Sequence, residues 1–256
     1  MDIKDVTFSY DKKLNTLHGI DGSIDIGKVT TIIGPNGCGK STLLGVLSNH
    51  YNPQKGEVQL DGKALTDFKL KELAKRIAIV HQQNKAPFDM TVEKLTAYGR
   101  IPYKTLFSTS TKEDEEAVEW ALASTNLLDK RQTPIHELSG GQMQRVWIAM
   151  ALTQRTPFLF LDEPTTYLDI YYQYELLELV RELNEQHGIT IVMVLHDINQ
   201  AIRYSDTIVV MKDGKIAAKG EPTDVITADA IKDIYGIHVV VMLDEETGMY
   251  IVPIGI

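Results

Sequence analysis

The stretch from Gly34 to Thr42 constrains the fold more than any other part of this chain. It fits the pattern Gly-x-x-x-x-Gly-Lys-Ser/Thr, which describes a loop that holds nucleotide phosphates. The β-branched, apolar run 29–33 before it predicts a buried strand, and the run 41–47 after it predicts a helix. Strand, glycine-rich loop and helix together form the context in which this motif is specific. The residues of the predicted loop are Gly34, Pro35, Asn36, Gly37, Cys38, Gly39, Lys40, Ser41 and Thr42.

The residue types in this loop suit an anion site. Glycine lets the backbone turn with positive φ and bring bare N–H groups up to an anion, and the helix N-terminus adds a partial positive charge. Lys40 supplies a mobile full charge for the β- and γ-phosphates. Ser41 offers a hydroxyl to Mg²⁺, a hard cation that prefers oxygen ligands. Cys38 is expected to be only a small residue that fits a variable position. The alternative for the whole stretch is a glycine-rich turn with a chance lysine.

Bulk composition limits the remaining classes. A chain of 256 residues with 43% hydrophobic and 24% charged residues has the composition of a soluble globular protein. The net charge of −9 argues against a general nucleic-acid binder, and a single cysteine suits a reducing compartment. We expect neither a signal peptide nor a membrane span, because no run approaches the roughly 18 apolar residues that a span requires. Any link to a membrane is then expected to go through a partner.

The order of elements predicts an α/β fold: a P-loop NTPase core with a mixed sheet, an N-terminal antiparallel β subdomain and an inserted helical subdomain. The N-terminal strands are expected at Val6–Tyr10, Leu17–Ile26 and Gly56–Lys63, the last with an Asp-Gly turn. The region of about 84–155 shows no clear strand and is expected to be the helical subdomain. Further strands are predicted at 77–80, 158–161, 190–195 and 207–211, a helix at 227–235, and a C-terminal hairpin within about 237–256.

Two adjacent carboxylates, Asp162 and Glu163, follow the apolar strand 158–161. At the carboxyl end of a parallel strand they would lie where α/β folds bind ligands. Asp162 could hold Mg²⁺, directly or through water, and Glu163 could polarise an attacking water, as phosphoryl transfer requires. The alternative is an acidic pair on a solvated turn.

The stretch 138–142, Leu-Ser-Gly-Gly-Gln, precedes an apolar helix. It could form a second anion site at a helix N-terminus. It could equally be a simple Ser139 N-cap before a buried helix. The chemistry of the residues leaves these two interpretations open.

This last stretch resembles the signature motif of ATP-binding-cassette (ABC) ATPases. The order of motifs is also similar to that family: phosphate loop, glutamine after a strand, signature, acidic strand end, then His196 after a strand. The resemblance covers almost the whole chain, so residues 1–256 are expected to form a single ABC nucleotide-binding domain. It implies that the chain binds and hydrolyses ATP with Mg²⁺.

The resemblance gives individual residues their roles. Tyr10 resembles the aromatic residue that stacks on adenine, with a strand-face tyrosine as the alternative. Gln82 resembles the glutamine that senses Mg²⁺ and the attacking water, although Gln83 is only one position away. Glu163 resembles the general base, and His196 the switch histidine that contacts the γ-phosphate.

The resemblance also implies a composite site in a head-to-tail homodimer. Each ATP would lie between the phosphate loop of one copy and the signature of the other, and Leu168–Asp169 would cross to the partner subunit. Magnesium would be held by Ser41, Gln82 and Asp162. The nucleotide-contacting residues of the signature are expected to be Ser139, Gly140, Gly141 and Gln142.

A single cassette is similar to an importer subunit that docks on a separate integral-membrane permease at the cytoplasmic face, with a substrate-binding protein as an indirect partner. The stretches 164–170, 90–92 and 98–103 are similar to cassettes of iron(III)–siderophore importers, a subgroup shared with haem and vitamin B12 importers. Three other classes are weighed against this: an exporter or other-cargo cassette, a soluble non-transport cassette, and a small-molecule kinase. The signature and His196 argue against the kinase.

Overall fold

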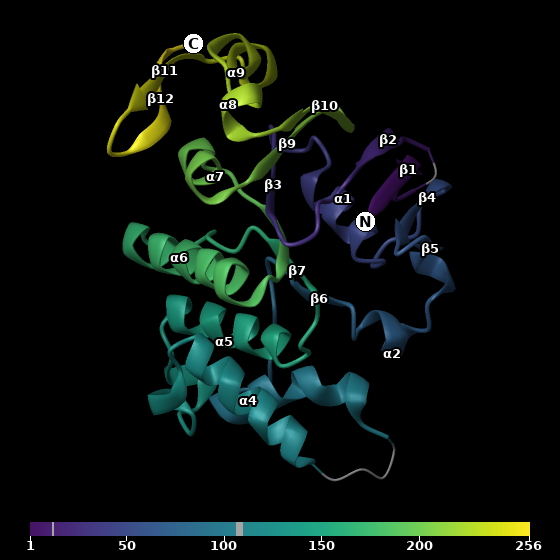
Figure 1. The fold of residues 1–256 in the computed structure, drawn as a ribbon, viewed down its shortest axis with the longest axis vertical. Helices are drawn as coiled ribbons and strands as arrows, with labels where there is room; N and C mark the ends of the chain where they lie inside the picture. Colours follow the sequence, from purple (N-terminus) through teal and green to yellow (C-terminus); the bar gives the residue numbers. More distant parts are fainter. Residues whose placement is uncertain (12, 106–109) are drawn as a thin grey trace. The chain divides into compact units, whose positions relative to one another are not determined.

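The computed structural model describes residues 1–11, 13–105 and 110–256 (Figure 1). The chain divides into two compact units. One unit contains Met1–Asp67 and Val192–Ile256, and we call it the phosphate-loop unit. The other contains Phe68–Ile191, and we call it the helical unit. Each unit is described by itself.

The N-terminal strands of the phosphate-loop unit form the predicted antiparallel sheet. Its order is β2–β1–β4–β5, with β1 at Asp2–Phe8, β2 at Leu17–Ser23, β4 at Lys55–Leu60 and β5 at Lys63–Ala64. Strand β1 begins at Asp2, four residues before the predicted Val6, and the prediction was also wrong about where β1 and β2 end. Strand β1 ends before Tyr10, because the side chain of Gln54 replaces the ladder at Ser9, accepting from its N–H (2.7 Å) and donating to its carbonyl (2.6 Å). Strand β2 ends before Ile26, since its partner strand runs out at Met1.

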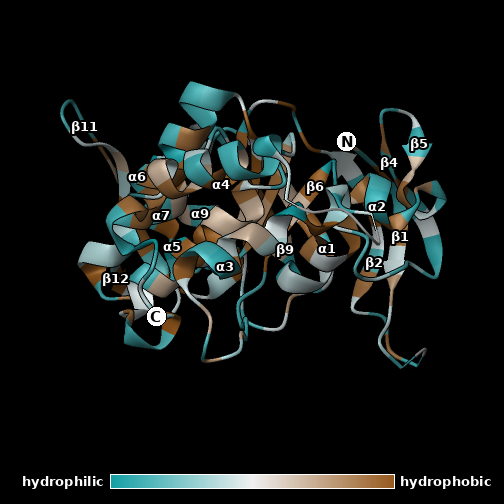
Figure 2. Cartoon of the chain, turned by 90° about the horizontal axis from the view of Figure 1, so that it is seen from below, coloured by the Kyte–Doolittle hydropathy of each residue, from teal (hydrophilic) through white to brown (hydrophobic). Residues whose placement is uncertain are grey.

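The other strands of this unit position the phosphate loop. Strand β3 (Val29–Ile33) is buried along its whole length and runs parallel to β9 (Thr207–Lys212). Strand β10 (Lys215–Gly220) returns antiparallel to β9 through the predicted Asp213–Gly214 turn. Helix α1 (Lys40–Leu47) follows β3 directly after the loop, as predicted, and most of its residues are buried. The hydropathy of the residues along the chain can be followed in Figure 2.

The C-terminal part of the phosphate-loop unit contains short helices and a hairpin. Helix α7 spans Ile198–Tyr204, α8 spans Pro222–Val225 and α9 spans Ala228–Tyr235. Helix α9 ends at Gly236, which adopts φ +72°, a conformation that glycine adopts readily. Strands β11 (His238–Asp244) and β12 (Gly248–Gly255) form the predicted hairpin.

The helical unit contains two strands that pair in parallel, β6 (Ile77–Val80) and β7 (Phe158–Asp162), and the chain between them in sequence is helical. Between them the described residues contain no strand, as predicted for 84–155; residues 106–109 of that range lie outside the described residues. Strand β8 (Thr190–Val194) carries the chain into the phosphate-loop unit. The helices of the unit are α2 (Leu70–Leu73), α3 (Val92–Ala97), α4 (Lys112–Ser124), α5 (Gly140–Leu152) and α6 (Ile170–His187), with 3₁₀ turns at Tyr98–Tyr103, Leu128–Lys130 and Ile135–Glu137.

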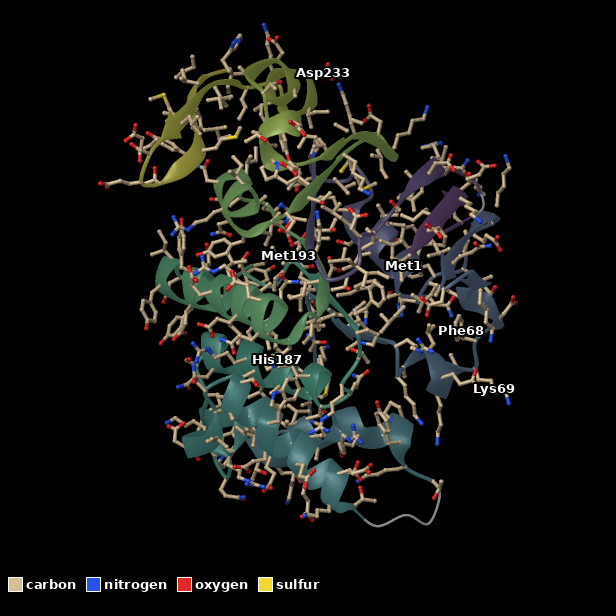
Figure 3. The ribbon with its side chains drawn as sticks, viewed as in Figure 1. Met1, Phe68, Lys69, His187, Met193 and Asp233 are labelled. Atoms are coloured by element: carbon tan, nitrogen blue, oxygen red, sulfur yellow. The ribbon has the colours of Figure 1, made fainter. Side chains whose placement is uncertain are left out.

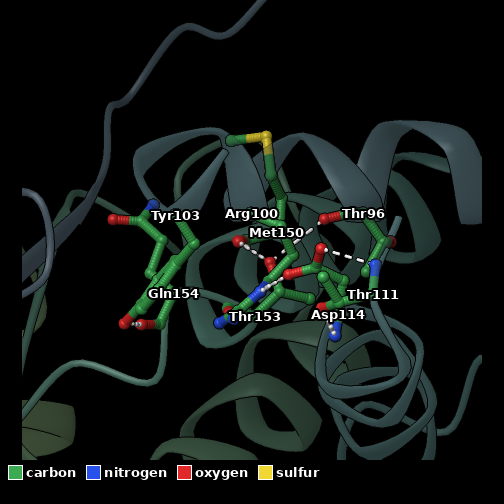
Figure 4. Close-up of polar contacts among 8 residues, drawn as sticks. All are labelled: Thr96, Arg100, Tyr103, Thr111, Asp114, Met150, Thr153 and Gln154. Atoms are coloured by element: carbon green, nitrogen blue, oxygen red, sulfur yellow. Dashed lines mark hydrogen bonds and ion pairs between the residues drawn. The ribbon is translucent and has the colours of Figure 1, made fainter. Parts of the chain in front are cut away.

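A buried ion pair ties the helical unit together (Figure 4). Arg100 donates from Nε to Asp114 Oδ1 (2.7 Å) and from Nη1 to the carbonyl of Thr153 at the end of α5 (2.8 Å). Asp114 also accepts from the N–H of Thr111, which completes the capping box of α4. Burial alone would raise the pKa of Asp114, but hydrogen bonds from Arg100 and Thr111 together hold that pKa below its ordinary value.

Candidate functional site

The phosphate loop curls around its own lysine. Lys40 is only 5% exposed, and its Nζ donates to the carbonyls of Gly34 (2.9 Å) and Pro35 (3.1 Å). An ammonium group has three N–H donors, and these two carbonyls account for two of them. The loop is therefore held in shape by the same charge that is predicted to bind phosphate.

Two glycines of this loop adopt backbone conformations that a side chain would not permit. Gly34 has φ +151°, and a Cβ there would lie 2.3 Å from the carbonyl oxygen of Met211. Gly39 is the N-cap of α1 at φ +102° and has no side chain to satisfy the first amides of the helix. Those amides therefore remain suited to an anionic ligand. Cys38 is buried, and burial raises the pKa of its thiol, which fits the expectation of a small space-filling residue.

The ring of Tyr10 is fixed at its edge but open to solvent. Its hydroxyl forms a 2.9 Å hydrogen bond with Thr42 Oγ1, and it packs edge-to-face against Phe8 (5.0 Å) and Tyr51 (5.4 Å). The side chain is nevertheless 61% exposed. A fixed, exposed aromatic ring beside a phosphate loop is suited to stacking on a flat base.

His196 lies at the same edge of the sheet as the phosphate loop. It follows β8, and the N–H of Leu195 donates to the carbonyl of Ile32 (3.3 Å). This bond aligns the end of β8 with the end of β3, which leads directly into Gly34. The exposed imidazole of His196 therefore belongs to the neighbourhood of the loop, as the sequence predicted.

In the helical unit, Gln82 and Glu163 are in direct contact. Gln82 Nε2 donates to Glu163 Oε2 (2.6 Å), and Thr166 Oγ1 donates to the same oxygen (3.2 Å). Glu163 follows the last residue of β7, Asp162, and adopts φ +50°, which is unusual for a residue with a side chain. Of the two candidate glutamines, Gln82 is the one that reaches the carboxylate. Sequence analysis missed Thr166, which belongs to no pattern that marks it.

The signature residues begin helix α5. The Ser139 hydroxyl accepts from the Gln142 N–H (3.3 Å), and Gln142 Oε1 accepts from the Ser139 N–H (3.0 Å). The N-cap interpretation is therefore confirmed, and the exposed Ser139 and Gly140 still leave room for an anion. A Cβ on Gly141 would lie 2.8 Å from the ring of Tyr172, a tight approach that the sequence did not reveal.

The loop before α6 lies beside the signature. A Cβ on Gly140 would contact Leu168 Cδ2 at 3.9 Å. Asp169 is the N-cap of α6 and accepts from the N–H of Tyr172 (3.2 Å). The side chain predicted to cross to a partner subunit thus also begins a helix, and within the helical unit it is grouped with the signature.

The candidate magnesium ligands offer the donor set that this ion prefers. Ser41 presents a hydroxyl and Asp162 a carboxylate, and because Gln82 Nε2 is used on Glu163, its remaining polar atom is an oxygen. No group of three or more His, Cys, Asp or Glu residues that could hold a metal occurs among the described residues. Each of these residues, taken by itself, can offer an oxygen ligand of the kind that Mg²⁺ prefers. None of the described helices is long and apolar enough to cross a bilayer.

Comparisons with known proteins agree with this geometry. The pattern of the ABC transporter family matches residues 17–166. The chain is 45% identical over 244 residues to the ferric enterobactin transport ATP-binding protein FepC of Escherichia coli (strain K12), covering 95% of this chain and 90% of that protein. It is 45% identical over 225 residues to the iron(3+)-hydroxamate import ATP-binding protein FhuC of Bacillus subtilis (strain 168), covering 88% of this chain and 84% of that protein.

A solved structure shares the fold at 31% identity: the bacterial ABC transporter cassette MJ0796, in a dimeric structure. The TM-score is 0.75, over 86% of this chain and 98% of that one. The chain therefore belongs to the ABC transporter family. Within the family it is an ATP-binding ATPase subunit that resembles those of iron(III)–siderophore importers.

Proposed function

We propose that this protein hydrolyses ATP to energise the import of an iron(III)–siderophore, or a related metal chelate, through a separate membrane permease. The contact between Gln82 and Glu163 is the observation that carries the catalytic part of the proposal, because it holds a carboxylate at the end of β7 in a defined orientation. Similarity to FepC and FhuC, both described as ATP-binding proteins of iron-chelate uptake, supports the transport part.

The nucleotide is bound mainly by the phosphate-loop unit. The amides at the start of α1 and the ammonium of Lys40 bind the phosphates, and Tyr10 stacks on the adenine. His196, at the same sheet edge, contacts the γ-phosphate. Mg²⁺, when bound through Ser41, Asp162 and Gln82, supplies neutralisation of the charge on the phosphate oxygens.

Glu163 acts as the general base. It accepts a proton as the water oxygen bonds to the γ-phosphorus and the bond to the β–γ bridging oxygen breaks, which releases ADP and phosphate. The hydrogen bonds from Gln82 and Thr166 both reach Oε2, so they fix the plane of the carboxylate before the water arrives. This fixed orientation reduces the reorganisation that the reaction requires.

The active form is a head-to-tail homodimer. Ser139 and the amides of Gly140 and Gly141 from one copy close on the phosphates bound by the other, and Asp169 approaches the shared boundary. Ser139 and Gly140 are exposed at the start of a 13-residue helix, which makes them available to a second molecule. The dimeric structure of MJ0796 supports this arrangement. ATP then favours the closed dimer and hydrolysis favours its release.

We place the subunit at the cytoplasmic face of the membrane, as a peripheral partner of integral-membrane permease subunits and, through them, of a substrate-binding protein. The test is to purify the chain with its permease, reconstitute both in vesicles with ATP, and measure uptake of ferric siderophore, haem and vitamin B12. Uptake of the ferric siderophore alone supports the proposal. Uptake of only haem or vitamin B12 contradicts the cargo assignment, and ATP hydrolysis without a membrane partner supports a non-transport cassette.

A further inference from the structure

The end of β9 and the turn between β9 and β10 contact the phosphate loop directly. The carbonyl oxygen of Met211 leaves no space for a side chain on Gly34, and the N–H of Gly214 donates to the carbonyl of Cys38 (3.1 Å). Both contacts reach the loop backbone between its first glycine and Lys40. Since backbone amides of this loop bind phosphate, its geometry depends on where this turn is held.

Helix α9 holds the turn in place. Lys212 Nζ, at the end of β9, donates to the carbonyl of Asp233 (2.8 Å) and pairs with its carboxylate at Oδ2 (3.2 Å). Asp233, which is labelled in Figure 3, lies in the last turn of α9. These bonds connect a C-terminal helix to the strand that abuts Gly34, across 21 residues of sequence.

The last residue of α9, Tyr235, also reaches the loop itself. The backbone of Gly34 and the side chain of Cys38 are among the groups that act on the pKa of the Tyr235 hydroxyl, so this hydroxyl lies near the loop. Burial raises the pKa of Tyr235, so the phenol stays neutral and acts as a hydrogen-bond partner rather than as a charge.

We propose that α9 is a positioning element of the phosphate loop, and that Tyr235 and the Lys212–Asp233 pair set the affinity of the loop for nucleotide. The proposal rests on the proposed function, because it concerns the same nucleotide site. Tyr235 acts through Gly34 and touches no reacting atom, so it is a positioning residue. The C-terminal segment thereby controls ATP binding without contacting ATP.

The experiment compares Tyr235→Phe and Lys212→Met with a matched control, Lys215→Met, which removes an exposed lysine from β10. The full chain is titrated with MgATP at equilibrium, and KM, kcat and the melting temperature are measured for each variant. We expect both test variants to raise Kd and KM about fivefold, with kcat within twofold and melting unchanged, since each loses a single hydrogen-bonding group. The control should match the wild type.

Unchanged Kd in both test variants would overturn the proposal, as would a loss of kcat at constant KM. An equal rise in Kd for Lys215→Met would also overturn it, because the effect would then follow charge alone. The equilibrium titration separates this inference from the proposed function: a wild type that binds but does not hydrolyse ATP refutes the hydrolysis, while the Kd comparison still decides the role of α9.

Discussion

In the phosphate-loop unit, the anion-binding groups are backbone amides and a lysine that is 5% exposed and bonded to its own loop. In the helical unit, Ser139 and Gly140 are exposed, and the capping box of their own helix holds the serine. The phosphate loop is thus already held in its shape without a ligand, whereas the signature presents an exposed helix N-terminus. The difference teaches that nucleotide affinity should reside in the phosphate-loop unit, and turnover in the helical unit.

The largest expected effect tests the assignment of turnover to the helical unit. Glu163→Gln keeps the shape of the side chain but removes the base, so hydrolysis should fall roughly 10³-fold, the usual scale for losing general-base catalysis. ATP affinity should remain within about twofold if affinity belongs to the other unit, and the ATP-bound dimer should accumulate. Phosphate release, equilibrium binding and size-exclusion chromatography measure these three outcomes.

Glu137→Gln is the matched control, because it removes an exposed carboxylate from the same unit. It should hydrolyse ATP at the wild-type rate. Full turnover by Glu163→Gln would refute the assignment of Glu163 as the base. A large loss of its ATP affinity would contradict the assignment of affinity to the phosphate-loop unit alone.

The second effect concerns the scaffold that carries the signature helix. Asp114→Asn leaves Arg100 as a buried charge without its carboxylate, which should cost about 3 kcal/mol of unfolding free energy. Because the folded pKa of Asp114 is lowered, its contribution is complete above the ordinary carboxyl pKa and is lost as the pH falls through the folded value. Chemical denaturation at several pH values should therefore show the wild type and the variant converging in acid.

The exposed neighbour Glu115 supplies the control, and Glu115→Gln should change the unfolding free energy little. If Asp114→Asn were as stable as the wild type at neutral pH, the buried pair would not be what holds the 3₁₀ turn Tyr98–Tyr103, α4 and α5 together.

The third effect tests the preformed loop. Lys40→Ala removes the ammonium that bonds the carbonyls of Gly34 and Pro35, so it loses both the phosphate charge and the loop geometry. Affinity for ATP should fall roughly 30-fold, the scale of a hydrogen bond to a charged group. Calorimetric titration measures it, with Lys28→Ala as an exposed-lysine control on the same unit. Undiminished affinity would undo the phosphate-loop interpretation.

The features that could be predicted from the sequence depend on neighbouring residues. Those that could not be predicted depend on contacts between residues far apart in the chain. The strand, loop and helix around Gly34–Thr42 and the Ser139 N-cap could be read from the sequence because a few neighbouring residues determine them. The end of β1 was not, since Gln54 replaces the ladder at Ser9 across 45 residues. The choice between Gln82 and Gln83 stayed open because only a contact across 81 residues decides it. Motif spacing thus predicted which residues are candidates for the site, and side-chain hydrogen bonds between distant parts of the chain determine how these side chains are oriented.

The smallest expected effect sharpens the comparison within the phosphate-loop unit, by separating base recognition from phosphate binding. Tyr10→Ala should weaken ATP binding roughly fivefold through loss of stacking, while inorganic triphosphate should bind it as it binds the wild type. Tyr10→Phe is the matched control: it keeps the ring and its contacts with Phe8 and Tyr51 but loses the hydrogen bond to Thr42. If Tyr10→Phe and Tyr10→Ala weakened ATP binding equally, the loss would come from the hydroxyl and its hydrogen bond to Thr42 in α1. Tyr10 would then support the phosphate loop rather than bind the base.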